Sequence, residues 1–510
     1  MPIFKMAYLP PLLIYVSAGV SGLTSIVGIF FIKDYLSLSA AFIASIGFWA
    51  GIPWALKMPI GFLIDRYWSL KQYFVYLGAF LVSMSLLIMY GILVHKSFML
   101  EYLEIKIWFI LSAILTPVGY VLQDVVADAM TVEAVEPDFK NKYKKTDNEK
   151  IKKEHTNVQL YGRFAIILGS LIVGLLNFFI FKNVDTNQPN INLLYGKIYL
   201  FALIIPVISV SGIILFNFLN TNLKKAIQFK TTKLDYQIFL GSCVFVIFTI
   251  LLGTLNIIFS KEIILLLSLL LISILMRLLI KGLEKEDQRT IVGTAVIIFI
   301  FRAMPSPGAG LNWFEIDVLG FDQSFFSVLS ITSSLITLIG MIILRKLMMR
   351  APLANLFVVL SIISAFLYTP SLFMYYELHE YTSFVTNGLI DARFIAVLNT
   401  AVESPLAQVA MIPMLAWIAK NAPSKYKATF FAVFASFTNI ALSARELFTS
   451  YLNKFFLISR EVVDQKSNDI IVKANYDDLD NLLISLIIIT LVIPLITIYL
   501  IQKTKFRSTE

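Results

Sequence analysis

Long runs of apolar residues, separated by short polar segments, recur along almost the whole chain of 510 residues. A helix rises about 1.5 Å per residue, so a run of about 20 apolar residues crosses the roughly 30 Å hydrocarbon layer of a bilayer. The pattern predicts roughly fourteen transmembrane helices. We expect these spans at residues 8–32, 39–65, 72–95, 105–128, 158–182, 194–219, 236–259, 262–280, 289–311, 322–345, 352–375, 393–419, 428–455 and 481–502.

Composition agrees with a membrane protein. Hydrophobic residues make up 58% of the chain, whereas soluble domains have roughly 45–50% and a water-soluble fold cannot bury the excess. The chain has three His and one Cys, Cys243, which are too few for a disulfide framework or a Cys/His metal site. There is no HExxH motif and no phosphate-cradling loop. We therefore expect an all-α polytopic membrane protein that is not an enzyme and holds no metal or cofactor.

The basic residues predict orientation. A net charge of +9 is compatible with nucleic-acid binding in a soluble protein, but in a membrane protein the placement of Lys and Arg first reports topology. With the N-terminus inside, about 27 of the 42 Lys and Arg fall in inside loops and tails. Both termini are then cytoplasmic, in a cell membrane, and no nucleic-acid partner is expected. The Lys-rich stretch 140–153 is interpreted as a solvated, topology-setting loop, with a lipid or protein docking site as the alternative.

A short repeat divides the chain in two. The segment FIKDYLSL at 31–38 parallels FEIDVLGF at 314–321 at a constant offset, and each leads from one predicted helix into the next. Internal repeats are common in transporters. We expect an N-terminal six-helix half at 1–219 and a C-terminal six-helix half at 289–510, joined by a cytoplasmic linker at 220–288 that carries two inserted helices.

The turn after the second helix contains a Gly, an acidic residue and several cations. The stretch GFLIDRYWSLK begins at Gly61 and includes Asp65 and Arg66. It resembles the signature that major facilitator transporters carry between helices two and three, although the later Gly of that signature is missing. The resemblance implies the major facilitator fold and a gating role for Asp65 and Arg66.

Two carboxylates share one face at the end of the fourth helix. Asp124 and Asp128 are four residues apart, and like charges at that spacing repel each other unless a cation lies between them. Arg163 in the next helix is the nearest candidate in sequence. The alternative is that both carboxylates simply meet water at the membrane interface.

Several motifs together resemble the folate/biopterin transporter family. They include the run from Asp124 through Asp128 to Glu133, the FIKDYLSLS turn, and the stretch from Phe301 to Gly308; further matches are Pro413, Ala422-Pro423, the ATFFA run from Ala428 and Asn439. The usual Gly is replaced by Ala129. The resemblance implies a folate or pterin cargo, moved with protons. The muropeptide permease family has a related carboxylate motif at the same helix end and is the nearest alternative.

Prolines predict a break in the ninth span. Pro305, Ser306, Pro307 and Gly308 interrupt an apolar run, and freed backbone groups in a membrane need protein or a wet cavity as partners. Broken helices commonly line substrate sites, but a kink needed only for packing is an equal alternative. On the first helix, Gly19, Gly22 and Gly28 are expected to permit close helix contact.

Among the charged residues inside predicted spans, we single out six, each of which costs roughly 2.5–3.5 kcal/mol if it faces lipid at mid-depth. They must face one another or a water-filled cavity. Lys57 has no acidic residue within a turn and is expected to bind an anionic cargo, unless it pairs with Glu403 or Asp124. Glu403 is the candidate proton-coupling carboxylate, or the partner of an arginine. The charged set is Lys57, Asp124, Arg163, Arg302, Glu403 and Arg445.

These observations predict an alternating-access carrier, built as a monomer, for an anionic small molecule and protons across a lipid bilayer. Its cavity residues are expected to be Lys57, Arg302, Glu403, Arg445 and Trp54, with Trp54 stacking on a flat ring. Its gating and coupling residues are expected to be Asp65, Arg66, Asp124, Asp128, Arg163, Pro305 and Pro307.

Overall fold

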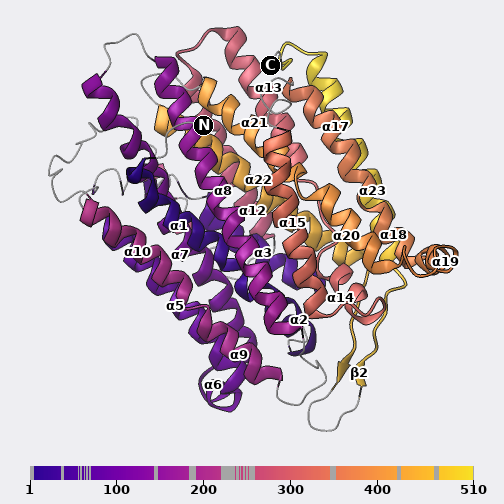
Figure 1. The fold of residues 1–510 in the computed structure, drawn as a ribbon. Helices are drawn as coiled ribbons and strands as arrows, with labels where there is room; N and C mark the ends of the chain where they lie inside the picture. The colour runs from indigo at the N-terminus through magenta and orange to yellow at the C-terminus, as the bar shows by residue number, and fades with distance from the viewer. Residues whose placement is uncertain are drawn as a thin grey trace. The chain divides into compact units, whose positions relative to one another are not determined.

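The computed structural model is almost entirely helical (Figure 1). It describes residues 5–35, 39–55, 57, 60–61, 64, 67, 70–142, 148–182, 191–219, 236, 240–241, 243–244, 247–248, 251, 259–344, 352–421, 427–463 and 470–508.

Ten helical segments of the described chain are long and apolar enough to cross a membrane, and each overlaps a predicted span. The polytopic all-α prediction is thus confirmed. The ten segments are Met6–Phe31, Lys71–Val94, Ile105–Thr131, Leu160–Phe181, Ile191–Leu219, Ser260–Ile280, Gln323–Ile343, Leu353–Tyr375, Ala392–Met414 and Leu479–Gln502.

The other four predicted spans have different outcomes, so the total of fourteen stays a prediction. The span at 39–65 contains a shorter apolar helix, Ala40–Trp54, and the span at 236–259 lies largely outside the described residues. The span at 289–311 is split into two helices, Lys285–Arg302 and Ala309–Asp317. The span at 428–455 is one continuous helix, Lys427–Phe455, but it carries many polar side chains.

The chain forms two compact units. The first comprises Met1–Val27 and Leu56–Leu240, and the second comprises Gly28–Ala55 and Gly241–Glu510. The first unit holds η1 (Met6–Tyr8), α1 (Leu9–Val20), η2 (Ser21–Thr24), α5 (Lys71–Val94), α6 (Lys96–Tyr102), α7 (Ile105–Lys142), α8 (Asn148–Phe181), α9 (Ile191–Phe201) and α10 (Ile204–Leu219).

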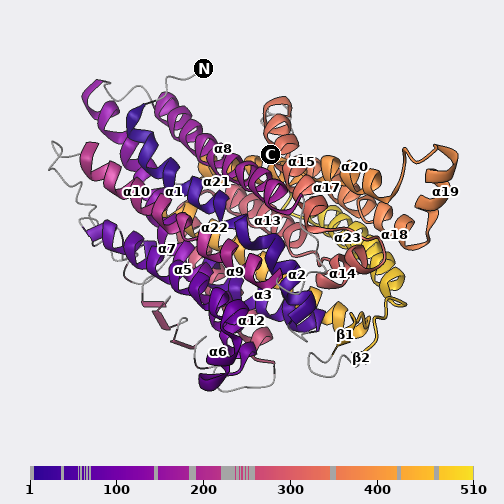
Figure 2. The same ribbon diagram turned by 60° about the horizontal axis from the view of Figure 1, so that its bottom comes forward.

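The second unit holds most of α2 (Ser25–Tyr35), all of α3 (Ala40–Ala55) and every element from α12 (Ser260–Ile280) onward. The elements after α12 are α13 (Lys285–Arg302), α14 (Ala309–Asp317), α15 (Gln323–Ile343), α17 (Leu353–Phe366), α18 (Thr369–Tyr375), α19 (Leu378–Val385), α20 (Ala392–Glu403), α21 (Leu406–Asn421), α22 (Lys427–Phe455), β1 (Val462–Val463), β2 (Ile470–Val472) and α23 (Leu479–Gln502). Within it, α17 and α23 run side by side, as Figures 1 and 2 show. The division into six-helix halves with an inserted pair stays a prediction.

Small residues let helices of the first unit approach closely. A Cβ added at Gly19 of α1 would lie 2.0 Å from the backbone oxygen of Ile166 on α8, so this position tolerates no side chain. A Cβ at Gly22 would meet only ordinary contacts, and one at Gly28 would meet nothing within 4 Å. The predicted close contact is therefore confirmed at Gly19 alone.

Helix α22 packs on α3 and α12 inside the second unit. Added Cβ atoms at Gly47 and Gly51 of α3 would lie 2.9 Å from Glu446 Oε2 and 2.6 Å from Ser443 Oγ of α22. Lys261 at the start of α12 donates a hydrogen bond of 2.6 Å to Ser45 on α3. The second inserted helix is therefore tied to this unit by a polar contact as well as by apolar packing.

A small antiparallel hairpin follows α22, where the sequence predicts only a loop. β1 pairs with β2, and a further bridge joins Ser459 to Asn475. Buried Arg460 lies over the ring of Trp313, 5.5 Å from its centroid. Tyr476 donates a hydrogen bond of 2.5 Å to Asp317 Oδ2. Burial, together with that acceptor, raises the pKa of the Tyr476 hydroxyl, so it remains a donor at physiological pH.

Candidate functional site

In the first unit, a lysine lies between two carboxylates. The ammonium group of Lys57 donates a hydrogen bond to Oδ2 of Asp124 and lies 3.7 Å from Oδ2 of Asp128. The Lys57 side chain is 15% exposed and that of Asp124 is 18% exposed, whereas Asp128 retains 42%. Pairing offsets the cost of placing these charges in a membrane. Asp128 is the more accessible of the two carboxylates.

Tyr15, which the sequence analysis did not single out, makes a further contact with Asp128. Tyr15 of α1 is 4% exposed and donates a hydrogen bond of 2.5 Å to Oδ1 of Asp128. Its ring lies against Gly162 of α8, where an added Cβ would be only 2.8 Å from the ring. The glycine leaves room for the ring, so three helices fix one hydroxyl on one carboxylate.

Arg163 adds a second positive charge to this group. It follows Gly162 on α8 and lies within electrostatic range of Lys57 and Asp128. We call Tyr15, Lys57, Asp124, Asp128 and Arg163 the first-unit cluster. Its two cations balance its two carboxylates when all four are ionised, and the direct partner of the carboxylates is Lys57 rather than Arg163.

In the second unit, the predicted helix break is present. α13 ends at Arg302, α14 begins at Ala309, and Gly308 has a left-handed backbone with φ of 73°. Partners on other helices take up the freed backbone groups. Ser306 N donates to Thr449 Oγ1 at 3.0 Å, and the carbonyl of Pro307 accepts from Asn453 at 3.2 Å.

The partners of the break lie on one face of α22. Arg445, Thr449 and Asn453 are spaced four residues apart and so share that face. From α18, Tyr368 donates to the carbonyl of Pro305 at 3.4 Å. The Nε of Arg445 is buried and makes no hydrogen bond to any residue that the structure describes. This face of α22 therefore carries two polar side chains, Thr449 and Asn453, that bond the backbone of the break. It also carries one cation, Arg445, whose Nε–H has no acceptor among the described residues.

Carboxylates lie near that cation. Arg445 is within electrostatic range of Glu403, the last residue of α20, and of Glu446 on its own helix. Glu315 of α14 is within electrostatic range of Glu403, and Tyr368 is within range of both Arg445 and Glu403. We call Glu315, Tyr368, Glu403 and Arg445 the second-unit cluster. Glu315 and Glu403 can share one proton, because ionising both places two like charges close to each other.

The predicted site residues fall into these two groups. Lys57 belongs to the first unit, and it pairs with Asp124, one of the two partners that the sequence left open. Arg302, Glu403, Arg445 and Trp54 belong to the second unit, where the carbonyl of Trp54 accepts a hydrogen bond of 3.0 Å from Asn439. A single cavity that joins all five stays a prediction. Asp65 and Arg66 lie outside the described residues.

Sequence reasoning missed five residues that belong to these clusters or bond the helix break. Tyr15, Tyr368 and Asn453 carry no local signal, because their partners are far away along the chain. Glu315 stands in the FEIDVLGF repeat, and Thr449 lies one turn from Arg445. For Glu315 the available signal was a carboxylate within the repeat, and for Thr449 it was a helical spacing from Arg445.

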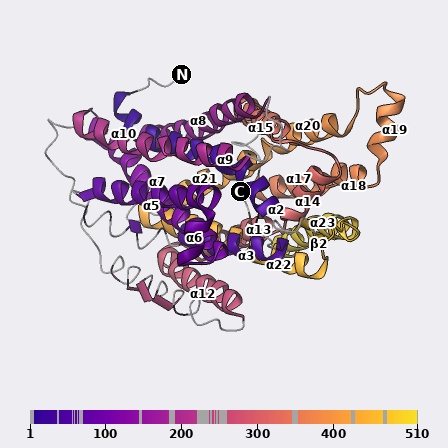
Figure 3. The same cartoon turned by 90° about the horizontal axis from the view of Figure 1, so that it is seen from below.

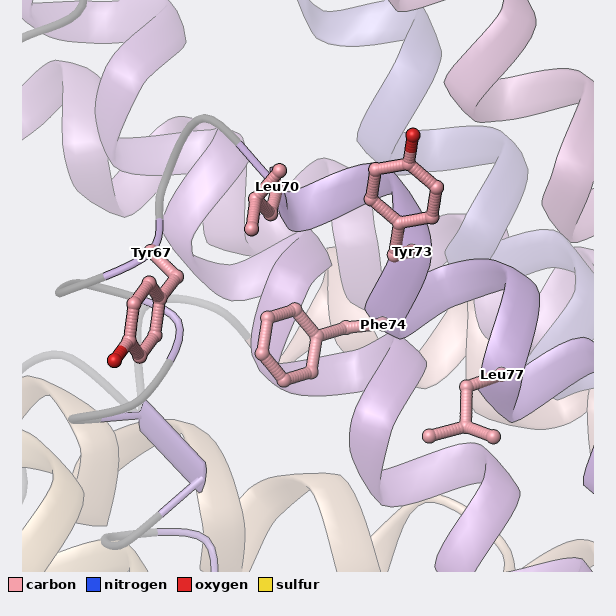
Figure 4. Close-up of a pocket in the computed structure, with 5 residues that line it drawn as sticks. All are labelled: Tyr67, Leu70, Tyr73, Phe74 and Leu77. Carbon is pink, nitrogen blue, oxygen red and sulfur yellow. The ribbon is translucent and has the colours of Figure 1, made fainter.

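A pocket of about 320 Å³ lies elsewhere in the first unit, near the start of α5 (Figure 4). Its lining is aromatic and aliphatic, and Figure 4 shows the hydroxyls of Tyr67 and Tyr73 pointing away from Phe74. None of its described lining residues is charged. The lining residues are Tyr67, Leu70, Tyr73, Phe74 and Leu77.

Comparison with known proteins establishes the family. The model of the BT1 family matches residues 18–508, nearly the whole chain and both units. The chain belongs to the BT1 family. It is therefore a multi-pass membrane transporter, and the expected resemblance to folate/biopterin transporters is confirmed at the family level.

Individual relatives of this BT1 family member are more distant. The chain is 24% identical over 154 residues to a folate-biopterin transporter of Synechocystis sp. (strain ATCC 27184 / PCC 6803 / Kazusa), and the match covers 30% of each chain. A crystal structure of a POT family transporter with a thioalcohol-conjugated peptide is similar, with a TM-score of 0.65, 13% identity, and coverage of 99% of this chain and 96% of that one.

Two further solved structures share the fold. A POT family transporter in complex with 5-aminolevulinic acid has a TM-score of 0.65 and 14% identity over 99% of this chain and 96% of that one. A point mutant of the nucleoside transporter NupG has a TM-score of 0.58 and 12% identity over 97% of this chain and 99% of that one. The major facilitator fold predicted from the sequence is confirmed.

Proposed function

We propose that this BT1 family transporter carries folate-like or pterin-like anions by alternating access, with protons as the coupling ion. The observation that carries the proposal is the buried Nε of Arg445, which makes no hydrogen bond within the described part of the chain and lies near Glu403. A guanidinium binds carboxylates in a fixed, often bidentate geometry. An anionic cargo would supply the acceptor.

The acidic members of the two clusters support proton coupling. Glu403 and Glu315 are within electrostatic range of each other, and carboxylates inside transmembrane bundles commonly form proton relays in transporters. In the first unit, Asp128 is the accessible carboxylate beside Lys57. We propose that protons bind at Glu403 and that the first-unit cluster transmits the change to the gate, in which Asp65 and Arg66 also take part.

Lys57 has a more specific role in this proposal than the sequence suggested. It is paired with Asp124 in the structure, so an anionic cargo would compete with Asp124 for the same ammonium group. Lysine suits such an exchange of partners because its flexible side chain makes point-charge contacts. Arg302 and the ring of Trp54 would complete the site.

The cargo class rests on the family and on one relative. The relative from Synechocystis is named a folate-biopterin transporter, and a folate carries carboxylates that suit Arg445. The POT neighbours hold a peptide conjugate and 5-aminolevulinic acid, which makes a muropeptide or another organic anion the competing cargo. We further propose a monomer in a cell membrane, with both termini cytoplasmic, as the placement of Lys and Arg favours.

Uptake of labelled folate into proteoliposomes under an inward proton gradient tests this function. We expect saturable uptake in the unmodified protein and its loss in Arg445→Ala, whereas Arg289→Ala removes an exposed arginine of α13 and should leave uptake unchanged. Glu403→Gln should retain exchange of folate across the membrane but lose accumulation driven by the gradient, because an amide does not titrate in this range.

A separate result would refute each part of the proposal. Uptake of muropeptides or other anions without uptake of folate or pterin would refute the cargo and leave the carrier intact. Folate uptake that ignores the proton gradient would refute proton coupling. Equal loss in Arg445→Ala and Arg289→Ala would refute the role of Arg445.

A further inference from the structure

The short helix α19 exposes large apolar side chains, which a surface helix in water normally buries. It spans Leu378–Val385 between α18 and α20, and none of its residues is buried. Phe384 is 84% exposed, Tyr381 70% and Val385 60%. By contrast, the polar Thr382 and Ser383 are only partly exposed. A surface helix in water turns its polar face outward and its apolar face toward the protein, and α19 does the reverse.

Helical geometry gathers the apolar side chains of α19 into one stripe. At 100° per residue, Leu378, Tyr381, Phe384 and Val385 fall within about a third of the helix circumference. The polar residues His379, Glu380, Thr382 and Ser383 occupy the remainder. Leu389, which follows the helix, is 76% exposed and extends the apolar surface.

The loop that carries this stripe is held in one conformation by its own hydrogen bonds. Thr382 Oγ1 donates to the carbonyl of Ile390 at 2.8 Å, and Ile390 N donates to Thr386 Oγ1 at 2.9 Å. Gly388 N donates to the carbonyl of Ser383 at 2.7 Å. Left-handed residues stand at both ends, at Glu377, Asn387 and Gly388. The outward apolar face is therefore a fixed feature of the fold.

The chain connections keep α19 near the end of two membrane spans. Two residues separate α18 from α19, and six separate α19 from α20; at roughly 3.3–3.6 Å per extended residue the shorter link spans only a few ångströms. Figures 1, 2 and 3 all show α19 beyond α18 and α20 within this unit. Exposed apolar side chains of α20, Phe394 and Leu398, continue the surface toward the span.

We propose that α19 lies in the lipid headgroup region and anchors the connected ends of α18 and α20 to the membrane surface. Tyr and Phe are favoured at this depth, where a ring meets acyl chains while hydroxyl and backbone groups reach water. The occupant of the stripe is lipid because the stripe continues into the exposed apolar face of α20, which belongs to a helical segment of membrane-spanning length. The proposal rests on the family's membrane location and not on the cargo.

Site-directed spin labelling of the full chain in phosphatidylcholine vesicles tests the anchor. Cys243 is the only cysteine, so a Cys243→Ala background allows one label at a time, introduced by Phe384→Cys, by Val385→Cys or by Ser383→Cys as the polar-face control. The collision rate of the spin label with oxygen, which concentrates in lipid, is compared with its collision rate with a water-soluble nickel chelate. We expect the oxygen-to-nickel ratio at 384 and 385 to exceed that at 383 several-fold.

Two results overturn the proposal. Equal access of the nickel chelate to 383, 384 and 385 means that the stripe faces water. Exclusion of both reagents from 384 and 385 means that protein, such as a second copy of the chain, covers the stripe. Folate uptake plays no part in this readout, so failure of the proposed cargo leaves the test unaffected.

Discussion

The hydroxyl of Tyr15 donates a 2.5 Å hydrogen bond to Oδ1 of Asp128, across 113 residues of sequence. Asp128 thereby receives a donor from α1 while Lys57 lies 3.7 Å from its other oxygen. The two oxygens of one carboxylate are held by two separate segments of the first unit. A change at either contact is expected to reach the other.

Replacing Tyr15 by Phe tests whether this contact serves transport. The ring and its packing on Gly162 are kept, and only the hydroxyl is lost. A hydrogen bond to a charged group contributes about 1.5–3 kcal/mol, and we expect the maximal uptake rate to fall while KM changes little, because the Tyr15 side chain is buried. Tyr199→Phe, at a buried tyrosine of α9, is the matched control. A rise in KM as large as the fall in rate would contradict this role.

The ion pair between Lys57 and Asp124 predicts non-additive mutants. Lys57→Met leaves Asp124 and Asp128 without the ammonium group between them, and removing one member of a buried pair costs about 3–5 kcal/mol. Asp124→Asn should cost less, because Lys57 keeps Asp128 at 3.7 Å. The double substitution removes the repulsion between the two carboxylates, so we expect its thermal stability in detergent to exceed that of Lys57→Met. Uptake should stay low in the double variant if Lys57 also binds cargo. Simple addition of the two single effects on stability would show that the pair is not coupled.

The side chains that bond the helix break predict a stability effect confined to the part of α22 near Pro307. Thr449→Val and Asn453→Ala each remove a partner of the backbone near Pro307, and an unsatisfied buried polar group costs about 1–3 kcal/mol. We expect each to lower the melting temperature and the uptake rate. Thr438→Val is the control, because the Thr438 hydroxyl bonds only to a carbonyl of its own helix in the described contacts. Equal losses in all three variants would count against this role of Thr449 and Asn453.

Glycines of the first span are expected to differ sharply in their tolerance of a methyl group. Gly19→Ala places a Cβ 2.0 Å from a backbone oxygen of α8, which cannot move without shifting the helix. Gly28→Ala meets nothing within 4 Å, and replacing Gly in a helix favours folding by roughly 0.8–1 kcal/mol. We expect Gly19→Ala to reduce folded yield and Gly28→Ala to preserve or raise it, measured by size-exclusion chromatography. A well-folded Gly19→Ala variant would show that α1 and α8 can separate.

The sequence by itself determined that this protein lies in a membrane, where ten of its spans are, and which fold family it belongs to. Apolar runs of membrane length and helix-breaking residues act locally, so Lys71–Val94 or the break at Pro305 can be predicted from neighbours along the chain. Charged residues in apolar runs also marked the sites, because the cost of burying a charge makes a partner necessary.

Only the tertiary structure decided which partner each charge has. From the sequence, Lys57 could pair with Glu403 or with Asp124. In the structure it pairs with Asp124, because helix packing brings those segments together. The same holds for Tyr15 on Asp128 and for Asn453 on the carbonyl of Pro307, whose residues lie more than a hundred positions apart. The outward direction of the apolar face of α19 was likewise not predictable, since the spacing of its apolar residues does not say whether that face turns toward the protein or away from it. Such contacts depend on distances between helices, and hydropathy along the chain contains no information about those distances.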